Sequence, residues 1–402
     1  MRIGIATQWP FPDSSEHRTW KIVNTLVEAG HEVTVFTARK TAERLAIESR
    51  IVNVKSPWPD WALPSANPWK SAAPMPGNPY WAIWLAGEAR RLRLDWLMSK
   101  ELRLGLSTYW AARAAKSKFW IDLCENYPAW VRIERGDQLL MPVYAALAAV
   151  LEKRCAPVAD LVSVVTESNR QRLTQLGVSK TRVAVVSNTP YFQPMPRRSG
   201  LAERRELNLV YAGMLSRIRR LGLERLFRAL EQIGPKRESF RLHIAGDGSE
   251  AGRLRALSES LGLADCVQFH GRVPEFSSLF VRCDVGIIPY VLTEWAETTI
   301  ANKLFDYMAC GLPVWTTSMR PCTEIIDSVG CGWVSDDSVD GMAAVLKQLL
   351  CTSQEERQAK GERGRQAVLT SYNWNTDGRR MLDALASGAS RCEVTRSPRP
   401  VV

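Results

Sequence analysis

The sequence has little of what metal centres and cross-linked folds require. Four histidines occur in 402 residues, and the nine cysteines are scattered along the chain with no Cys-x-x-Cys pair. Zinc sites need closely spaced cysteine or histidine ligands, and disulfide frameworks need an even number of cysteines. The sequence therefore argues against both a metal centre and a disulfide framework.

Long apolar runs are also missing. No window of 18 residues is apolar throughout, and the longest candidate, residues 141–151, ends at Glu152 after about three helical turns. The chain starts with Met-Arg and a strand-like run rather than with a charged and then apolar leader. We expect a cytoplasmic protein, and a position at the inner face of the plasma membrane stays open.

Negative charge is scarce relative to positive charge. The net charge is +11, and residues 1–195 hold 25 Lys and Arg against 17 Asp and Glu. Such a basic half favours a phosphate-bearing ligand, an anionic membrane surface or nucleic acid, unless it is only a solvated surface rich in arginine. Nucleic acid is not supported, because no recognition helix or stacked-aromatic motif accompanies the basic residues.

What the sequence does contain is a repeated alternation of strands and helices. Arg2–Thr7 reads as an apolar strand, residues 17–29 have helical spacing, and Glu32–Thr37 reads as a second strand. Such a βαβ unit predicts a parallel sheet. The alternation begins again at Leu207–Ala212, after a stretch rich in proline and arginine. The fold class is therefore α/β, with two doubly wound domains in succession.

The domain boundaries follow from the same pattern. The expected parts are a first domain at 1–190, a linker at 191–206, a second domain at 207–372, a helix at 373–390 that packs back toward the first domain, and a disordered tail at 391–402. Further strands are expected at 119–123, 161–165, 183–187, 240–245, 267–270, 285–289, 313–317 and 332–334, and helices at 90–103, 141–155, 167–176 and 221–233.

Several short motifs together resemble a known family. They are Gly-His-Glu-Val-Thr-Val at 30–35, Asp-Leu-Cys-Glu-Asn-Tyr-Pro at 122–128, Tyr-Ala-Gly at 211–213, Ile-Ala-Gly-Asp-Gly at 244–248, His-Gly-Arg-Val-Pro at 270–274, and the stretch 299–314. In order and spacing the chain resembles the GT-B glycosyltransferases of family 4. The resemblance implies two Rossmann-like domains facing a cleft, with the nucleotide-sugar donor on the C-terminal domain and the acceptor against the N-terminal domain. It also implies retention of the anomeric configuration and no metal or cofactor besides the donor substrate.

The stretch 299–314 predicts a short helix with one polar face. Four of its polar residues lie three or four positions apart, Leu304 and Met308 mark the opposite face, and Gly311 ends the helix. By the resemblance, backbone N–H groups at the helix start bind the donor diphosphate, as helix N-termini bind anions. Asp306 stands at the second glutamate of the family's E-x7-E motif and would bind the ribose, whereas the first glutamate falls on Thr298. The donor-binding residues expected here are Thr298, Thr299, Ile300, Ala301, Asn302, Lys303 and Asp306.

Further donor contacts are expected at the ends of neighbouring strands. The resemblance implies a cation in the loop after the first strand of the second domain, where Arg217, Arg219 and Arg220 are available and Arg217, then Arg220, are preferred. Lys303 is a second phosphate candidate, and a solvated basic loop is the alternative for the arginines. Glycines 213, 246 and 248 permit tight turns at strand ends. The backbone at Arg272 and Val273 would face the base.

In the first domain, several positions depart from the family. Ser14 and Ser15 replace paired glycines, and Cys124 replaces a histidine near the reacting sugar. His17 is a substitute for that histidine unless it is a surface residue, and Glu125 is the acidic candidate unless it only caps the next turn. The stretch 79–85 with its following arginines suits a lipid-linked acceptor or membrane interface, or else packs its indoles in the core.

The resemblance therefore implies a retaining, metal-independent glycosyltransferase of the hexosyltransferase class. It would move a hexose-type sugar from a UDP- or GDP-sugar to a glycan or lipid-linked glycan in bacterial surface polysaccharide synthesis. Arg217, Arg220 and Lys303 would stabilise the departing diphosphate. The alternatives are a non-catalytic GT-B protein that binds nucleotide or glycan as a scaffold, favoured by the departures at Ser14, Ser15, Cys124 and Thr298, and a nucleotide-sugar epimerase.

Overall fold

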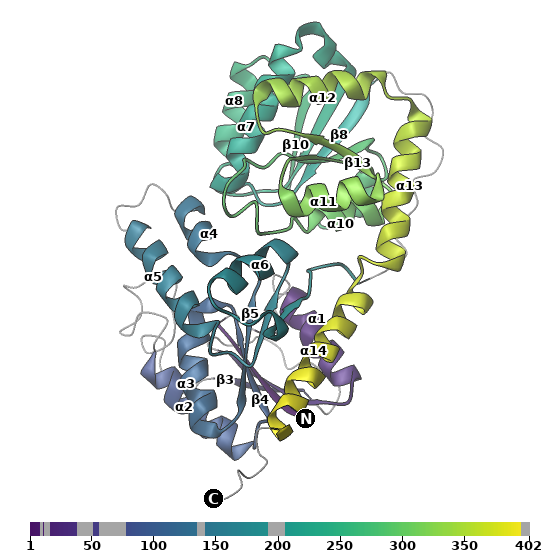
Figure 1. Cartoon of the computed structure of the whole chain (residues 1–402). Helices are drawn as coiled ribbons and strands as arrows, with labels where there is room; N and C mark the ends of the chain where they lie inside the picture. Colours follow the sequence, from purple (N-terminus) through teal and green to yellow (C-terminus); the bar gives the residue numbers. More distant parts are fainter. Residues whose placement is uncertain are drawn as a thin grey trace, which may run out of the picture. The chain divides into compact units, whose positions relative to one another are not determined.

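The computed structural model describes residues 1–8, 11, 17–37, 51–55, 78–134, 141–191 and 206–394. These residues form two compact units, each with its own parallel sheet (Figure 1). The first unit consists chiefly of residues 1–131, 141–188 and 377–394, and the second chiefly of residues 189–376. The first unit is therefore completed by the end of the chain.

The sheet of the first unit has seven strands in the order β3-β2-β1-β4-β5-β6-β7, and every neighbouring pair is parallel. The strand order reverses its direction between β1 and β4, so the connections on the two sides of this point run to opposite edges of the sheet. The strands are β1 (Arg2–Thr7), β2 (Glu32–Thr37), β3 (Ile51–Lys55), β4 (Trp96–Lys100), β5 (Lys118–Leu123), β6 (Leu161–Val164) and β7 (Val183–Val185).

The helices of the first unit lie on the two faces of this sheet (Figure 1). They start where the sequence offers a cap. Asn78, for instance, accepts a hydrogen bond from the backbone N–H of Trp81 at 3.0 Å, and Pro79 occupies the first turn. The helices are α1 (His17–Glu28), α2 (Pro79–Arg91), the 3₁₀ turn η3 (Leu102–Leu104), α3 (Gly105–Ala115), α4 (Tyr127–Glu134), α5 (Met141–Cys155), α6 (Glu167–Gln175) and the 3₁₀ turn η4 (Lys180–Arg182).

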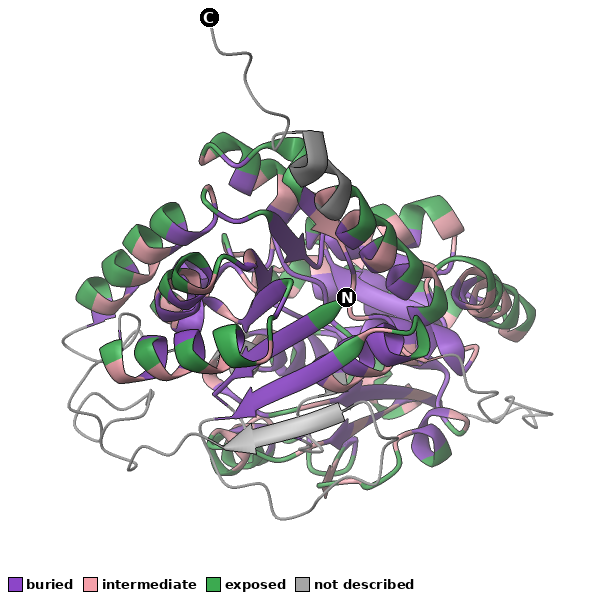
Figure 2. Ribbon diagram, turned by 90° about the horizontal axis from the view of Figure 1, so that it is seen from below, coloured by how far each residue is buried: buried purple, intermediate pink, exposed green. Residues whose placement is uncertain are grey.

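The strands carry the buried core, and the helices expose only their outer faces (Figure 2). Trp81, in the stretch that suited either a membrane interface or the core, is fully buried and packs against Trp84 with ring centroids 5.0 Å apart. Phe36 of β2 meets Trp84 edge to face at 5.6 Å. These indoles therefore belong to the core, where aromatic side chains bury large apolar areas.

The sheet of the second unit has six parallel strands in the order β10-β9-β8-β11-β12-β13. Here the order reverses between β8 and β11. The strands are β8 (Leu207–Ala212), β9 (Phe240–Ala245), β10 (Val267–Gly271), β11 (Val285–Ile288), β12 (Val314–Thr317) and β13 (Gly332–Ser335).

The last helix of the chain belongs partly to each unit. The C-terminal helix α14 (Trp374–Val394) begins in the second unit, and from Asp377 onward it belongs to the first. There Lys118 Nζ donates to the carbonyl oxygen of Gly388 at 2.7 Å. The other helices of the second unit are α7 (Arg217–Gln232), the 3₁₀ turn η5 (Gly234–Ser239), α8 (Ala251–Ser260), α9 (Ser277–Phe280), α10 (Lys303–Ala309), α11 (Arg320–Val329), α12 (Val339–Cys351) and α13 (Gln354–Thr370).

Several elements differ from the sequence-based expectations. Residues 96–100, expected to be helical, form strand β4, and β3 was not expected at all. Every residue of β4 is buried, so the strand has no alternation of polar and apolar residues that could have revealed it. Helix α7 starts at Arg217 rather than at residue 221, and α14 reaches Val394, four residues into the expected tail. Within the described parts of the chain, every helix is too short or too polar to cross a bilayer.

Candidate functional site

The first candidate site lies in the second unit, at the carboxyl ends of β8 and β11. The strand order reverses between these two strands, and at such a point the loops diverge and leave room for a ligand. Gly213 follows β8, Pro289 follows β11, and a methyl group added to Gly222 of α7 would overlap the Pro289 carbonyl oxygen. The backbone of α7 therefore packs directly on the loop after β11, which only a glycine permits.

The predicted glycines come together at this edge. Gly213 N donates to the Ala245 carbonyl at 2.8 Å, and Gly246 N donates to the Gly271 carbonyl at 2.7 Å. A Cβ atom on Gly246 would lie 1.9 Å from the Gly213 carbonyl oxygen, and one on Gly248 would lie 2.5 Å from the Leu215 carbonyl oxygen. The loops after β8, β9 and β10 are thus joined backbone to backbone, and the three glycines lie after strands β8 and β9.

Arg272 and Val273 follow β10 on the same edge of the sheet. Arg272 is exposed and Val273 is half-buried. They directly follow Gly271, whose carbonyl oxygen accepts a hydrogen bond from Gly246 N. This hydrogen bond joins the loop after β10 to the loop after β9. The contact of their backbone with a base stays a prediction.

The ammonium group of Lys303 lies beside the end of β8 and the loop after β11. Its Nζ atom lies 3.7 Å from the ring centroid of Tyr211 on β8 and 5.3 Å from that of Tyr290 in the loop after β11. A Cβ atom on Gly213 would lie 2.9 Å from this Nζ, so the ammonium group lies directly beside the Gly213 backbone, whose φ of 139° favours glycine. Aromatic faces attract a cation while they exclude water from it. The positive charge is therefore held at the point where the strand order reverses.

Arg217 is the first residue of α7, and Ser216 is its N-cap. The sequence had placed Arg217 and Arg220 in a loop, but the structure places both in the first turn of this helix. No acidic residue lies in that turn. Cations at a helix N-terminus are unfavourable because that end of the helix dipole is already positive. A bound anion would neutralise both the arginine charges and the positive end of the dipole. Arg217 is half-buried, and the side chain of Arg220 lies outside the described residues.

The helix predicted from Thr299 starts four residues later. Helix α10 begins at Lys303 with Asn302 as its N-cap, so the expectation of a helix N-terminus at Thr298 to Asn302 was wrong. The backbone N–H groups of Thr298 and Thr299 both donate to the Trp295 carbonyl, at 3.1 and 3.0 Å. They close a turn ahead of the helix, and Ile300 and Ala301 are buried behind it. The N–H groups of Thr298 and Thr299 are thus used within the turn, and a diphosphate contact through the N–H groups of Ile300 and Ala301 stays a prediction.

Thr298, at the position of the family's first glutamate, has a local structural role. Its hydroxyl donates to the carbonyl oxygens of Glu294 and Trp295, at 3.0 and 3.2 Å. The expected faces of α10 are confirmed, because Leu304 and Met308 are fully buried while Asp306 is half-buried. Binding of a ribose by Asp306 stays a prediction.

The second candidate site lies in the first unit, at the carboxyl ends of β1, β4 and β5. Arg18 of α1 forms a bidentate ion pair with Asp122, with Nε–Oδ2 at 2.9 Å and Nη2–Oδ1 at 2.7 Å. Both side chains are almost completely buried. Lys100, the last residue of β4, adds its Nζ atom at 3.2 Å from Oδ2. Ser163 of β6 donates to Oδ1 at 2.6 Å, so the carboxylate is saturated with donors.

Two cations therefore surround one buried carboxylate. Burial alone would raise the pKa of Asp122, but the charges of Arg18 and Lys100 outweigh it and hold this pKa well below its usual range. Cys124 lies beside the pair, 2.9 Å from Lys100 Nζ and 3.1 Å from the Asp122 carboxylate. Burial and the negative charge of Asp122 raise the pKa of this thiol to about 12. Cys124 is a neutral thiol here.

Of the other predicted acceptor-side residues, the structure describes the side chains of some and not of others. Cys124 and Glu125 are half-buried and follow β5 directly. His17 begins α1, but its side chain lies outside the described residues, as do Ser14 and Ser15 entirely. Sequence reasoning gave no functional role to the residues that the structure concentrates here, namely Arg18, Lys100, Glu101 and Asp122. One sequence signal could have identified Asp122, namely a charged residue near the end of an apolar run, as in residues 119–123.

The polar groups of the site in the second unit are the Lys303 ammonium, the Arg217 guanidinium and the Asp306 carboxylate, and those of the site in the first unit are Arg18, Lys100 and the carboxylates of Asp122 and Glu101. In the described part of the chain, no three His, Cys, Asp or Glu side chains gather into a group that could hold a metal ion. The arrangement in the second unit suits an anion, and the arrangement in the first unit suits a polar ligand with hydroxyl groups.

Comparison with known proteins identifies two domains in the chain. A glycosyl transferase 4-like domain matches residues 15–189, and a domain of the glycosyl transferases group 1 matches residues 206–352. A similar protein is the putative colanic acid biosynthesis glycosyltransferase WcaL of Salmonella typhimurium, 24% identical over 230 residues, or 56% of each chain. Another is the GDP-mannose-dependent alpha-(1-6)-phosphatidylinositol monomannoside mannosyltransferase of Mycolicibacterium smegmatis, 27% identical over 57% of this chain and 62% of that protein. The matched region thus spans less than two thirds of these relatives.

Solved structures agree over nearly the whole chain. Anabaena Alr3699/HepE in complex with UDP superimposes with a TM-score of 0.71, at 15% identity, over 96% of this chain and 100% of that one. WaaG, a glycosyltransferase involved in lipopolysaccharide biosynthesis, gives 0.67 at 16% identity over 94% and 98%. At such identities the likeness shows the fold, while the two domain matches show the family. The chain belongs to the glycosyl transferases group 1 and has the GT-B fold of these glycosyltransferases.

Proposed function

We propose that the chain is a retaining, metal-independent glycosyltransferase that moves a hexose-type sugar from a UDP- or GDP-sugar to a glycan or lipid-linked glycan. The observation that carries the proposal is the ammonium group of Lys303, held between Tyr211 and Tyr290 beside Gly213. A cation at the reversal point of a parallel sheet, next to glycines that allow close backbone approach, suits the diphosphate of a nucleotide-sugar.

This site would promote the transfer by electrostatic stabilisation of the leaving group. When the bond between the anomeric carbon and the phosphate oxygen breaks, negative charge grows on the departing nucleoside diphosphate. Lys303 lies beside Gly213 at the carboxyl end of β8, and Arg217 begins α7 after the same strand, so both would stabilise that charge. Asp306 on the same helix as Lys303 would accept hydrogen bonds from the ribose hydroxyls, each contributing about 1.5–3 kcal/mol.

The names of similar proteins support a setting in surface polysaccharide or glycolipid synthesis. The relatives include a colanic acid biosynthesis glycosyltransferase and a phosphatidylinositol monomannoside mannosyltransferase, and one structure with the same fold was solved with UDP-glucose. Polysaccharide chains and glycolipids both present a sugar hydroxyl as acceptor. We therefore assign the acceptor to this class, and the donor to UDP- or GDP-sugars.

A lipid-linked acceptor would require contact with a membrane surface, and helix α5 offers one. Val143, Leu147 and Val150 lie on one helical face and are 62%, 40% and 52% exposed. Lys153 and Arg154 follow in the last turn and are exposed. An apolar stripe that ends in cations complements an anionic bilayer, so α5 is the proposed contact of the first unit with the membrane.

The membrane contact is tested by co-sedimentation with phosphatidylglycerol vesicles and with phosphatidylcholine vesicles. Binding to the anionic vesicles alone, lost in Leu147→Glu and kept in a control such as Ile83→Glu on the exposed face of α2, is the expected result. Equal binding of wild type and Leu147→Glu would contradict the proposal for α5.

The donor site is tested by titrating the protein with UDP, GDP and ADP. We expect one nucleotide to bind selectively, and Asp306→Ala to weaken this binding about ten- to a hundred-fold. The matched control is Asp327→Ala on the exposed face of α11, which should bind as wild type does. Binding of no nucleotide, or binding indifferent to Asp306, would contradict a donor site here and favour the non-catalytic scaffold.

A further inference from the structure

Glu101 adopts a backbone conformation that is rarely found outside glycine. Its φ and ψ are 75° and 163°, and it follows β4 directly, ahead of the turn η3. This region of backbone space clashes with a Cβ atom, so a residue other than glycine is held there only at a cost in stability. Such strain persists when neighbouring contacts enforce it, and it concentrates at functional sites.

The surrounding hydrogen bonds enforce this conformation on both sides of the residue. Glu101 N donates to the Asp122 carbonyl of β5 at 3.1 Å, and Ser99 Oγ donates to the Glu101 carbonyl at 2.9 Å. The backbone is therefore fixed to β5 and to its own strand. The consequence is that the side chain leaves the sheet edge in a direction that a relaxed strand would not give it.

The carboxylate of Glu101 lies across the reversal point of the first sheet. Gln8, which follows β1, donates from Nε2 to Glu101 Oε2 at 3.2 Å. The strand order reverses between β1 and β4, so this hydrogen bond spans the place where parallel sheets bind ligands. Gln8 is the residue in the described part of the chain that donates to this carboxylate, which can accept about four hydrogen bonds. The Glu101 side chain is half-buried, so part of it is accessible to solvent.

The pKa of Tyr127 responds to the charge of the Glu101 carboxylate. Burial raises the pKa of the Tyr127 hydroxyl well above its usual value, and the next largest cause is the negative charge of Glu101. Cys124 and Asp122 contribute after it. The ends of β4 and β5 are joined by the hydrogen bond from Glu101 N to the Asp122 carbonyl, and the half-buried carboxylate of Glu101 lies at this place.

We propose that Glu101 receives the acceptor: its carboxylate accepts a hydrogen bond from the sugar hydroxyl that attacks the donor. The inference rests on the proposed function. In the transfer, the bond from the anomeric carbon to the phosphate oxygen breaks and the bond to the acceptor oxygen forms. The electron pair stays on the departing diphosphate, which also takes the hydroxyl proton, so Glu101 orients the hydroxyl and keeps no proton. The backbone strain is maintained because it fixes the direction of this carboxylate.

The test compares Glu101→Gln and Glu101→Gly with wild type. Transfer from the sugar nucleotide of the selected base is measured to octyl α-D-glucopyranoside and octyl α-D-mannopyranoside, and hydrolysis of the same donor by water is measured in parallel. Glu101→Gln, which keeps the size and the backbone strain, should lower transfer or hydrolysis about 10–100-fold. Nucleotide affinity should stay within twofold of wild type, because the donor site belongs to the second unit.

A thermal measurement separates a site residue from a structural one. Glu101→Gly removes the strain, so it should raise Tm by about 2–4 °C while activity is lost. The matched control is Lys116→Gly, at the left-handed C-cap of α3 with φ of 61° and an exposed side chain, which should raise Tm and leave activity unchanged. A lower Tm in Glu101→Gly would overturn the inference, because the side chain would then be kept for folding.

Two further outcomes are distinguishable. Unchanged transfer and hydrolysis in Glu101→Gln would overturn the role of Glu101 while leaving the proposed function intact. Failure of the wild type to bind UDP, GDP or ADP would contradict the proposed function itself, and the acceptor role of Glu101 would be rejected with it. The pairing of a gain in Tm with a loss of activity is the result that supports the inference.

Discussion

The guanidinium of Arg18 and the carboxylate of Asp122 form a bidentate ion pair that is buried in the first unit, although 104 positions separate them in the chain. Arg18 also donates from Nη1 to the carbonyl oxygen of Val186, at 2.9 Å, after β7. One side chain thus joins α1, the centre of the sheet and its far end. The pair fixes α1 at the edge where Glu101 and Cys124 lie.

Asp122→Asn should destabilise the protein by about 3–5 kcal/mol, because it leaves Arg18 and Lys100 buried without a counter-charge. The loss is read from urea unfolding at pH 7. The control is Glu88→Gln, which removes the exposed pair with Arg91 and should leave the unfolding midpoint unchanged. Equal midpoints for Asp122→Asn and wild type would contradict the prediction.

The same pair makes a prediction for acid unfolding. The pKa of Asp122 is held well below its usual range in the folded state, so its stabilisation is complete above the unfolded pKa of about 3.9 and is lost as pH falls through the lower folded value. The difference in unfolding free energy between wild type and Asp122→Asn should therefore be constant from pH 5 to pH 8. It should shrink only below about pH 4. A difference that already shrinks near pH 6 would show that another group is responsible.

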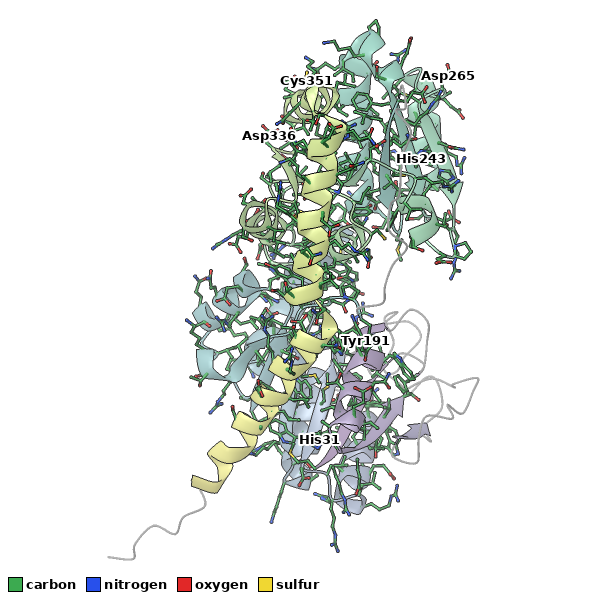
Figure 3. All side chains as sticks on the ribbon, turned by 90° about the vertical axis from the view of Figure 1, so that its right-hand side faces the viewer. His31, Tyr191, His243, Asp265, Asp336 and Cys351 are labelled. Carbon is green, nitrogen blue, oxygen red and sulfur yellow. The ribbon has the colours of Figure 1, made fainter. Side chains whose placement is uncertain are left out.

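Cys124 should resist alkylation in the native protein. Its pKa of about 12 leaves roughly one thiolate in ten thousand at pH 8, and the thiolate is the reactive form. Iodoacetamide at pH 8 should label the exposed Cys351, at the end of α12 (Figure 3), long before Cys124. Peptide mapping by mass spectrometry separates the two sites. Labelling of Cys124 at the rate of Cys351 would contradict a neutral, enclosed thiol.

Much of the fold could be predicted from the sequence because most strands are short apolar runs bounded by glycine or polar residues. Strands β1, β2, β8 and β9 lie where the sequence placed them. Strand β4 could not be predicted, because Trp-Leu-Met-Ser-Lys has no period of two and its Leu, Met and Lys favour helices. The start of α7 was missed because the resemblance placed Arg217 and Arg220 in a loop. The first turn also has no acidic residue, which is the usual sequence signal of a helix start.

The two candidate sites differ in how far the sequence revealed them. The glycines and Lys303 in the second unit belong to local motifs, so they could be singled out before the strand order was known. The cluster of Arg18, Lys100 and Asp122 depends on β1, β4 and β5 being neighbours, which no local pattern shows. The conformation of Glu101 could not be predicted either, because glutamate gives no sign of a positive φ.

The stability of the second unit should fall in mild acid because of His243. Its Nδ1 lies 3.0 Å from Nε2 of His270 (His243 is labelled in Figure 3), and burial, followed by the charge of His270, lowers the pKa of His243 to about 4. Between pH 6.5 and 4 the unfolded state binds the proton and the folded state does not, so stability decreases as pH falls. Since the side chain is partly exposed, we expect a loss of about 1–2 kcal/mol.

The measurement is urea unfolding at pH 7.0 and pH 4.5 for wild type and His243→Gln. The variant lacks the titrating ring, so its unfolding free energy should change less between the two pH values, by the same 1–2 kcal/mol. An equal change in both proteins would assign the acid sensitivity to other groups, such as His270, whose pKa is also lowered by burial.

Gly246→Ala should abolish tight nucleotide binding, because the added methyl group would lie 1.9 Å from the Gly213 carbonyl oxygen and one of the two loops must move. Gly213 adjoins the ammonium of Lys303, so the displacement also shifts the cation proposed to hold the diphosphate. We expect affinity for the selected nucleotide to fall at least about tenfold, in a protein with a lower Tm. The control is Gly252→Ala in α8, where no atom lies within 4 Å of the new methyl group and alanine favours the helix by about 0.5–1 kcal/mol. If Gly246→Ala bound nucleotide as Gly252→Ala does, the close packing of the loops after β8 and β9 would not be what shapes the donor site.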